Sequence, residues 1–442
     1  MRRIRHLHIY RRIEGADKEE IKGDEIMTEL RRHAELIYSE VIRRALPDMA
    51  VKEALTDFHP VPGRTLLVSV GKAAWQMASA VLEVVNVDGG IVITKYGHSR
   101  GPLPGLEIWE AGHPVADAAS FSAAERALEL VKSLGSEDAV IFLLSGGGSA
   151  LFEQSDLSLR ELQDISRQML ACGADIQEMN RIRKRLSNVK GGRFGEACAP
   201  ARVFSVILSD VIGDRLDMIA SGPAAVDTST LEETLEAAER YRLRLSSRAR
   251  TLLERPLPSA LPWVENRICG SVSQLCRSAA EVCGGLGYQA RILSDCVEGE
   301  ARLAGVALAK ALLSAREAGE PIALIMGGET VVRLTGKGKG GRNQELALAA
   351  AAVLSGAAGT AVFSVGSDGT DGPTDAAGGF VDSGTETRLR RLGIEISAVL
   401  AENDSYHALK KTDGLIITGP TGTNVNDVSV ALYWPPDRRA GS

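Results

Sequence analysis

The chain alternates between short apolar runs and longer stretches in which apolar residues recur every three or four positions. The apolar runs have the length and the β-branched content of buried strands, and the stretches between them have the periodicity of helices. The first amphipathic helix is predicted over residues 27–46. Strands are predicted at residues 65–70, 90–95, 106–110, 139–144 and 203–208, and then at 288–293, 321–326, 360–365, 415–418 and 428–432.

This alternation predicts an α/β protein. The strands of the first half are continuous apolar runs separated by helices, which indicates a doubly wound, mostly parallel sheet with helices on both faces. At 442 residues the chain exceeds what one hydrophobic core usually serves, and prolines cluster between Pro256 and Pro262. We therefore expect an N-terminal α/β domain at residues 27–263 and a smaller mixed-sheet α/β domain at residues 264–433.

The first 26 residues do not follow this pattern. They combine an arginine-rich start with an acidic run at residues 17–20 and show little apolar periodicity. Met27 stands directly before the first predicted helix. We expect residues 1–26 to form a flexible extension, and an upstream start codon is an alternative explanation for them.

A glycine-rich loop in the second half has the composition of an anion site. The β-branched run at residues 330–332 leads into four glycines within residues 336–341, and Gln344 opens an alanine-rich helical stretch. Glycines let backbone N–H groups turn toward an anion, a helix start adds donors, and two lysines with Arg342 supply charge. The pattern predicts a phosphate or carboxylate cradle; the alternative is a solvated basic turn.

A second glycine loop follows the apolar run at residues 139–144. It reads Ser-Gly-Gly-Gly-Ser from Ser145 to Ser149, which provides close backbone approach and two hydroxyl groups. Lys72 follows the run at residues 65–70 in the same way. Ligands bind at the carboxyl ends of strands in doubly wound sheets, so both features predict a binding site, with a flexible turn and a solvent-exposed lysine as the alternatives.

Carboxylates also follow predicted strands. Asp210 comes directly after the run at residues 203–208, and Asp368 lies in a glycine-rich turn after the run at residues 360–365. One or two carboxylates together with phosphate oxygens commonly hold Mg²⁺, although capping of a helix is an alternative role for such acids. Asn188 and Lys190 stand beside another glycine turn.

Composition narrows the classes of partner. The net charge of -6 and the low aromatic content argue against nucleic acid or an acidic membrane. There is no apolar run long enough to span a bilayer, and the six cysteines show no CxxC spacing. We expect a soluble cytoplasmic protein with small-molecule substrates, and the sequence leaves open whether it forms a homodimer.

Several short motifs, taken together, resemble one known family. They are, in chain order, Val68–Lys72, Ser145–Leu151, Lys190–Gly192, Ser209–Asp214, Ser221–Pro223, Gly340–Glu345, Ser367–Asp375 and Gly422–Asp427. From Met27 onward the chain resembles the class II glycerate kinases, including their C-terminal module called MOFRL, which we expect at about residues 321–432.

The resemblance implies a glycerate 2-kinase that transfers phosphate from ATP to D-glycerate with Mg²⁺, usually giving 2-phosphoglycerate and ADP, in a cleft between two α/β domains. It implies that Lys72 and Arg342 are catalytic cations, and Asp368 is our first candidate for the base that takes the hydroxyl proton. Metal binding is predicted at Asp210 and Glu329. Substrate and phosphate contacts are predicted at Ser145, Gly146, Gly147, Gly148, Ser149, Asn188, Lys190, Gly340, Gly341 and Asn343.

Two other functions compete with this prediction. The chain has no Walker nucleotide loop, whereas Gly336, Gly338 and Gly341 match the Gly-x-Gly-x-x-Gly pattern of an NAD(P)H-dependent hydroxypyruvate reductase. No acidic residue ends the following strand at the position that reads the ribose, which disfavours the reductase. A non-catalytic regulator that binds sugar phosphates is the second alternative.

Overall fold

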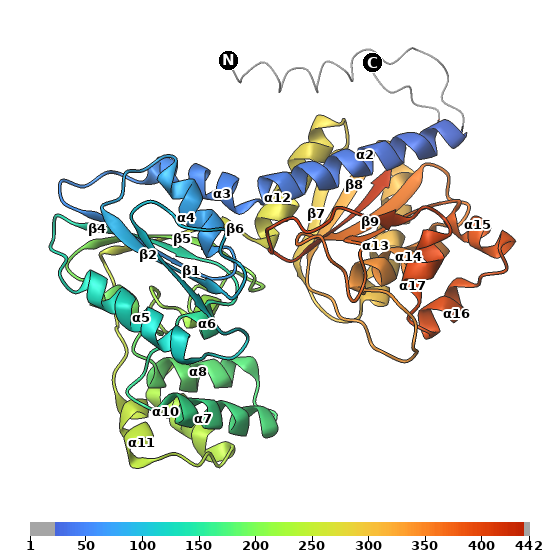
Figure 1. The fold of residues 1–442 in the computed structure, drawn as a ribbon. Helices are drawn as coiled ribbons and strands as arrows, with labels where there is room; N and C mark the ends of the chain where they lie inside the picture. The colour runs from blue at the N-terminus through green and yellow to red at the C-terminus, as the bar shows by residue number, and fades with distance from the viewer. Residues whose placement is uncertain (1–22, 437–442) are drawn as a thin grey trace. The chain divides into compact units, whose positions relative to one another are not determined.

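The computed structural model describes residues 23–436, which form two compact units (Figure 1). The N-terminal unit contains Arg43–Leu275 and the short segment Gly422–Asn426. The C-terminal unit contains the rest of the described chain, including the first helix up to Ile42. The predicted boundary at residue 264 therefore differs from the observed division.

The N-terminal unit is built on a six-stranded sheet in which every neighbouring pair of strands is parallel. Its order is β3-β2-β1-β4-β5-β6. The strands are β1 (Thr65–Val70), β2 (Gly89–Lys95), β3 (Leu106–Ala111), β4 (Ala139–Leu144), β5 (Arg202–Leu208) and β6 (Val264–Gly270). This confirms the predicted doubly wound sheet and adds β6, which pairs with β5 and explains why the unit extends past residue 264.

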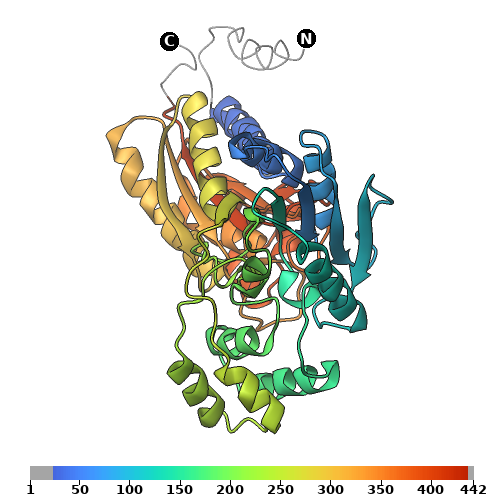
Figure 2. The same cartoon turned by 90° about the vertical axis from the view of Figure 1, so that its left-hand side faces the viewer.

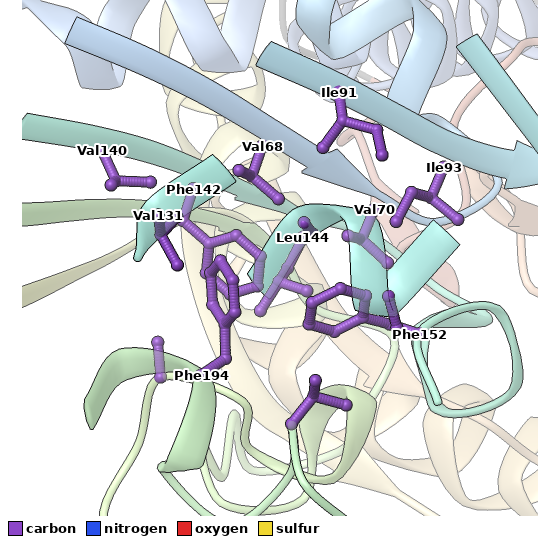
Figure 3. Packing of buried hydrophobic residues seen from close by; sticks show 14 of the residues in the cluster. Val68, Val70, Ile91, Ile93, Val131, Val140, Phe142, Leu144, Phe152 and Phe194 are labelled. Atoms are coloured by element: carbon purple, nitrogen blue, oxygen red, sulfur yellow. The ribbon is translucent and has the colours of Figure 1, made fainter. Parts of the chain in front are cut away.

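Helices cover both faces of this sheet, as the apolar runs predict. On one face lie α3 (Pro47–Ala54) and α4 (Ala74–Leu82), and on the other lie α5 (Ala118–Val131), α6 (Gly148–Leu151) and α9 (Arg193–Ala197) (Figure 1). Three phenylalanines join β4, the end of α6 and α9, with Phe142 and Phe194 ring centres 4.7 Å apart and Phe152 edge-on to Phe194 (Figure 3). This packing fixes the segment that follows β4.

A group of four helices forms a separate core within the N-terminal unit (Figure 2). The helices are α7 (Leu159–Ala171), α8 (Ile176–Leu186), α10 (Leu231–Arg240) and α11 (Ser247–Glu254). Each begins at a side-chain cap, for example Asp175, which accepts the N–H of Glu178 at the start of α8. The short helix η2 (Ile219–Ser221) contacts both α6 and α8.

The C-terminal unit contains a mixed sheet of order β11-β10-β9-β12-β8-β7. Only β7 and β8 are parallel, which confirms the predicted mixed sheet. The strands are β7 (Gln289–Val297), β8 (Ile322–Gly328), β9 (Thr360–Gly366), β10 (Gly378–Asp382), β11 (Leu415–Ile416) and β12 (Asp427–Tyr433). The helices assigned here are α2 (Gly23–Arg44), α12 (Val272–Gly285), α13 (Ala301–Ala315), α14 (Arg342–Leu354), α15 (Thr385–Arg391), α16 (Ile396–Ala401) and α17 (Ser405–Lys410), of which α2 and α12 each cross a unit boundary.

Helix α2 packs on the C-terminal unit although the sequence predicts it in the first domain. Tyr38 meets Phe363 of β9 edge-on, and the guanidinium of Arg31 lies over the ring of Phe380 and donates to the carbonyl of Asp413. The opposite face of the sheet is covered by α13 and α14 (Figure 1). The apolar stripe of α2 is thus explained by burial on a sheet that lies far along the chain.

The structure differs from the prediction at residues 330–332 and at residues 23–26. Residues 330–332 do not form a strand, because their only ladder contact is an isolated bridge at Val331, and the strand before the glycine loop is β8. Of the predicted flexible extension, residues 1–22 lie outside the described residues, whereas residues 23–26 form the first turn of α2.

The contact between α13 and α14 depends on a glycine. A Cβ atom at Gly305 would lie 2.1 Å from the carbonyl oxygen of Leu346, so the two helices approach too closely for any side chain. We expect Gly305→Ala to lower the free energy of unfolding by about 1–3 kcal/mol through this clash. Gly284→Ala, in α12 with open space at its Cβ position, should instead raise it by about 0.5–1 kcal/mol. Urea denaturation of both variants measures the difference, and equal effects would contradict the packing argument.

Candidate active site

The N-terminal unit brings Lys72 and the glycine loop together where the strand order reverses. β1 pairs with β2 on one side and β4 on the other, so the residues that follow β1 and β4 meet at the topological switch point, where open α/β sheets bind ligands. The N–H of Lys72 donates to the carbonyl of Gly146, and the N–H of Ala73 donates to Ser145 Oγ. The sequence prediction that these two loops form one site is consistent with this geometry.

Each glycine of the loop makes room for a neighbouring side chain. A Cβ at Gly146 would lie 2.5 Å from Asp210 Oδ2, and a Cβ at Gly147 would lie 2.9 Å from the ring of His113 and 3.4 Å from Lys72 Cε. Gly147 also has a φ of 88°, which L side chains rarely adopt. The loop therefore collects a lysine, a histidine and a carboxylate at the switch point.

Lys72 is a cation without a partner at this point. Among residues 23–436 its ammonium group forms no hydrogen bond or ion pair, and its side chain is half-buried. Burial, together with the positive charge of Lys72, lowers the pKa of His113, so this histidine is neutral at pH 7. A neutral imidazole beside a free ammonium leaves the positive charge of Lys72 available to an anion.

A chain of hydroxyl and amide groups supports the far end of the loop. Ser149 Oγ lies 3.1 Å from Ser221 Oγ, and Ser221 donates to Asn180 Oδ1 of α8. Asn180 is not among the residues predicted for this site, whereas for His113, which precedes a proline in a loop, the sequence leaves open a substrate-facing or a structural role. The signal for His113 was its position just past the end of β3, at the same edge of the sheet as Lys72.

Two of the predicted substrate residues lie in structural contacts instead. Asn188 donates to Gln154 Oε1 and to Asp156 Oδ1, which holds the segment after α6. The ammonium of Lys190 is fully buried and pairs with Glu153, and burial lowers the pKa of this lysine. The structure does not bring either side chain into the cluster around Lys72.

We expect Lys190→Met to destabilise the fold strongly. It would leave the carboxylate of Glu153, which is 8% exposed, buried with only Ser187 Oγ as a partner, and breaking a buried pair in this way typically costs about 3–5 kcal/mol. The double variant Lys190→Met with Glu153→Gln should recover part of that loss. Urea denaturation measures the stability of both variants. Wild-type stability in Lys190→Met, together with a raised Michaelis constant for a substrate, would instead support the predicted role of Lys190 in substrate binding.

The C-terminal unit carries a second cluster, centred on Arg342 at the start of α14. The carboxyl ends of β8 and β9 and the start of β12 lie at one edge of the mixed sheet, because β12 runs antiparallel between these two strands. Arg342 Nε donates to Asp427 Oδ2 at 2.5 Å and Nη2 donates to Oδ1 at 3.1 Å, while Nη1 reaches Glu329 at 3.0 Å. This bidentate pair fixes the guanidinium in one orientation.

Burial shapes the charges of this cluster. It raises the pKa of Asp427 to about 6, even though Arg342 donates two hydrogen bonds to that carboxylate. Burial also raises the pKa of Asp371, which accepts the N–H groups of Asn343 and Gln344 at the first turn of α14. Asp427 follows Asn426, the last residue of the short segment that belongs to the N-terminal unit.

The predicted base, Asp368, lies at the same edge of the mixed sheet. A Cβ at Gly366 would be 3.4 Å from Asp368 Oδ1 and 3.3 Å from Asp427 Oδ1, so the two carboxylates flank this glycine. Asp368 is half-buried, and its Oδ1 accepts the N–H of Thr370 at 2.9 Å. Its role as the base stays a prediction.

The glycines of the loop before α14 are explained by close packing. Cβ atoms at Gly336 and Gly338 would lie 2.3 Å and 2.5 Å from the segment that ends α16, and one at Gly341 would lie 2.3 Å from Asp371. Asn343 is buried, and its side-chain amide hydrogen bonds to Ser364 and Asp371. A ligand role for Gly340, Gly341 and Asn343 thus stays a prediction, whereas Arg342 is the residue of this loop that the structure places beside carboxylates.

The predicted metal ligands fall in different units, Asp210 in the N-terminal and Glu329 in the C-terminal. Across the described part of the chain, no group of three or more His, Cys, Asp and Glu side chains is arranged to hold a metal ion. Asp210 places a carboxylate oxygen beside Gly146 of the glycine loop. None of the helices within residues 23–436 is long and apolar enough to cross a membrane.

The fold and the two clusters define an α/β protein in which Lys72 and a glycine loop lie at the switch point of a parallel sheet. Comparison with known proteins identifies the class further. The model of a domain of unknown function, DUF4147, matches residues 33–254, and that of the MOFRL family matches residues 322–427. The chain is 47% identical to a D-glycerate 2-kinase of Thermotoga maritima over 411 residues, covering 91% of this chain and 98% of that protein.

Two other relatives show how broadly the similarity extends. A crystal structure of a glycerate kinase from Thermotoga maritima matches with a TM-score of 0.88 and 46% identity, over 92% of this chain and all of that one. A protein of Agrobacterium vitis named putative hydroxypyruvate reductase is 40% identical over 90% of this chain and 93% of its own length. This chain belongs to the glycerate kinase family with a C-terminal MOFRL domain.

Proposed function

We propose that this protein phosphorylates D-glycerate with ATP, giving 2-phosphoglycerate and ADP. The observation that carries the proposal is the ammonium of Lys72, with which no residue of the described chain pairs, beside the Ser145–Ser149 loop at the switch point of a parallel sheet. Family membership supports the same reaction, since the relative with 47% identity is named D-glycerate 2-kinase.

The residues present suit phosphoryl transfer. The transferring group spreads its charge over three oxygens, so catalysis depends on positioning and on positive charge more than on covalent chemistry. Lys72 and the fixed guanidinium of Arg342 supply the two cations, and Asp368 is the proposed base for the substrate hydroxyl. The loop Ser145–Ser149 offers backbone N–H groups to an anion, while its two serine hydroxyls bond the protein itself.

A magnesium ion fits this donor set. Mg²⁺ is usually held by one or two carboxylates together with phosphate oxygens, and Asp210 points a carboxylate oxygen at the glycine loop. We propose Asp210 as its main protein ligand. Glu329 is the second candidate, although its carboxylate already pairs with Arg342. A bound Mg²⁺ would neutralise phosphate charge, and the chain's own residues would orient the substrate.

A coupled assay tests the function. Purified protein with ATP, Mg²⁺ and D-glycerate should release ADP, and the product should be a substrate for enolase, which accepts 2-phosphoglycerate and not the 3-isomer. A product that requires phosphoglycerate mutase first would place the phosphate on the 3-hydroxyl. Binding of phosphoglycerate without glycerate-dependent ADP release would favour the regulator instead.

The reductase alternative is tested in parallel by oxidation of NADH with hydroxypyruvate. A dinucleotide loop needs glycines that let the backbone approach the pyrophosphate. Gly336 and Gly338 instead face the chain segment around Glu402 and Asp404 at distances that leave no room for a ligand. We therefore expect no NADH oxidation above background.

A further inference from the structure

Helix α8 presents one arginine that the described structure leaves without a partner. Asn180, Arg183, Lys184 and Ser187 recur at the spacing that places residues on one face of a helix. Within residues 23–436, Arg183 makes no hydrogen bond and no ion pair within 4 Å. Its side chain is nevertheless half-buried, which is costly for an unpaired guanidinium.

The neighbours of Arg183 on this face place it beside the glycine loop. One turn before it, Asn180 bonds Ser221, which bonds Ser149. One turn after it, Ser187 Oγ donates to Glu153 Oε1 at 2.7 Å. Ser187 contacts Glu153 directly, and Asn180 is connected to Ser149 through Ser221, so the side chain between them lies on the face of α8 directed toward residues 149–153, at the end of the Ser145–Ser149 loop.

The charged groups around Arg183 have a net positive charge that one monoanionic ligand would neutralise. Glu153 is committed to Lys190 and Ser187, so it attracts Arg183 without hydrogen bonding to it. One carboxylate and two cations leave a net charge of +1 at this place. Burial lowers the pKa of Arg183, and the group stays charged at neutral pH. The other cation of this face, Lys184, is neutralised by Asp217 and Asp227.

We propose that Arg183 binds the carboxylate of the glycerate substrate through its planar fork. A guanidinium donates two parallel hydrogen bonds to a carboxylate, and the unpaired fork beside the glycine loop has this geometry to offer. This assignment rests on the proposed function, and it names the group that would distinguish glycerate from uncharged polyols. A phosphate of ATP has related chemistry, so the test must separate the two substrates.

The test is steady-state kinetics of Arg183→Met with each substrate varied in turn. We expect the Michaelis constant for D-glycerate to rise roughly 10- to 100-fold, the usual effect of losing hydrogen bonds to a charged group, with the constant for ATP changed less than about twofold. Arg183→Lys should give an intermediate rise, because it keeps the charge and loses the fork. Arg183→Lys also provides the test of the proposal if Arg183→Met does not fold.

Arg181 provides a matched control on the same helix. It pairs with Glu233 at 3.8 Å on a different face of α8, so Arg181→Met removes an arginine without touching the proposed site. Its Michaelis constants should equal those of the wild type. Discrimination between D-glycerate and glycerol, measured as the ratio of kcat/KM values, should fall in Arg183→Met alone, since only glycerate has the carboxylate.

The outcomes separate this inference from the proposed function. A wild-type enzyme that shows no glycerate kinase activity overturns both. An active wild type whose Arg183→Met and Arg183→Lys variants keep the normal Michaelis constant for glycerate overturns the assignment of Arg183 alone. A rise confined to ATP would also overturn it and assign the guanidinium to a nucleotide phosphate.

Discussion

Replacing Lys72 with methionine is expected to lower kcat for glycerate phosphorylation by roughly a hundredfold or more, the usual effect of losing one charge-stabilising donor. The ammonium has no partner in the described structure, so its charge does not take part in an ion pair that stabilises the fold. Its neighbours are the glycine loop and a histidine whose pKa is lowered. We expect a cation in this place to interact more strongly with the transferring phosphoryl group in the transition state than with the bound substrate.

Lys52→Met is the control for this variant. Lys52 forms a partly exposed ion pair with Glu83 on the surface, and removing such a pair costs about 1 kcal/mol of stability or less. Its kcat should stay near the wild-type value. A Lys72→Met enzyme with normal kcat and only weaker binding of ATP or glycerate would show that Lys72 is a binding anchor, which contradicts the mechanism proposed here.

The parts of the fold that the sequence predicts are those marked by a local pattern of apolar residues. β4 is a continuous apolar run, β1 is apolar except for Thr65 and Ser69, and all residues of both strands are buried. β6 escaped prediction because it is an edge strand, Val264–Gly270, in which three consecutive polar residues interrupt the apolar pattern beside a proline cluster. β10 is short and begins with two glycines, which have low strand propensity.

The candidate site likewise contains residues that local sequence predicts and residues that it does not. Lys72 and Ser145–Ser149 could be predicted because each follows a buried strand, and the strand order then brings them together. The buried pair of Lys190 and the unpaired fork of Arg183 could not, since both lie in the same arginine-rich stretch and differ only in what distant segments place opposite them. Burial of a charged side chain depends on such tertiary contacts more than on local sequence.

Arg342→Met is expected to lower kcat by a factor similar to that of Lys72→Met, roughly a hundredfold or more, because it removes the second cation proposed for the transition state. Unlike Lys72, Arg342 is held by a partner. Asp427 accepts from Nε and Nη2, and this bidentate pair sets the direction of Nη1, which donates to Glu329. Normal kcat in Arg342→Met, with only weaker binding of ATP or glycerate, would show that the arginine is a binding anchor.

The pKa of Asp427 adds a pH dependence to this prediction. Burial raises it to about 6, so the carboxylate is ionised above that pH and takes up a proton as the pH falls through it. Arg342 then loses its bidentate charged partner and keeps only Glu329, and we expect kcat to decline on the acid side with an apparent pKa near 6. In Asp427→Asn the side chain cannot ionise, so kcat should be lower at pH 7.5 and should lack this acid limb. Glu329→Gln removes the more exposed partner of Arg342 and should keep the limb. An acid limb that persists unchanged in Asp427→Asn would assign the titration to another group and would show that the Arg342–Asp427 pair does not control the reaction.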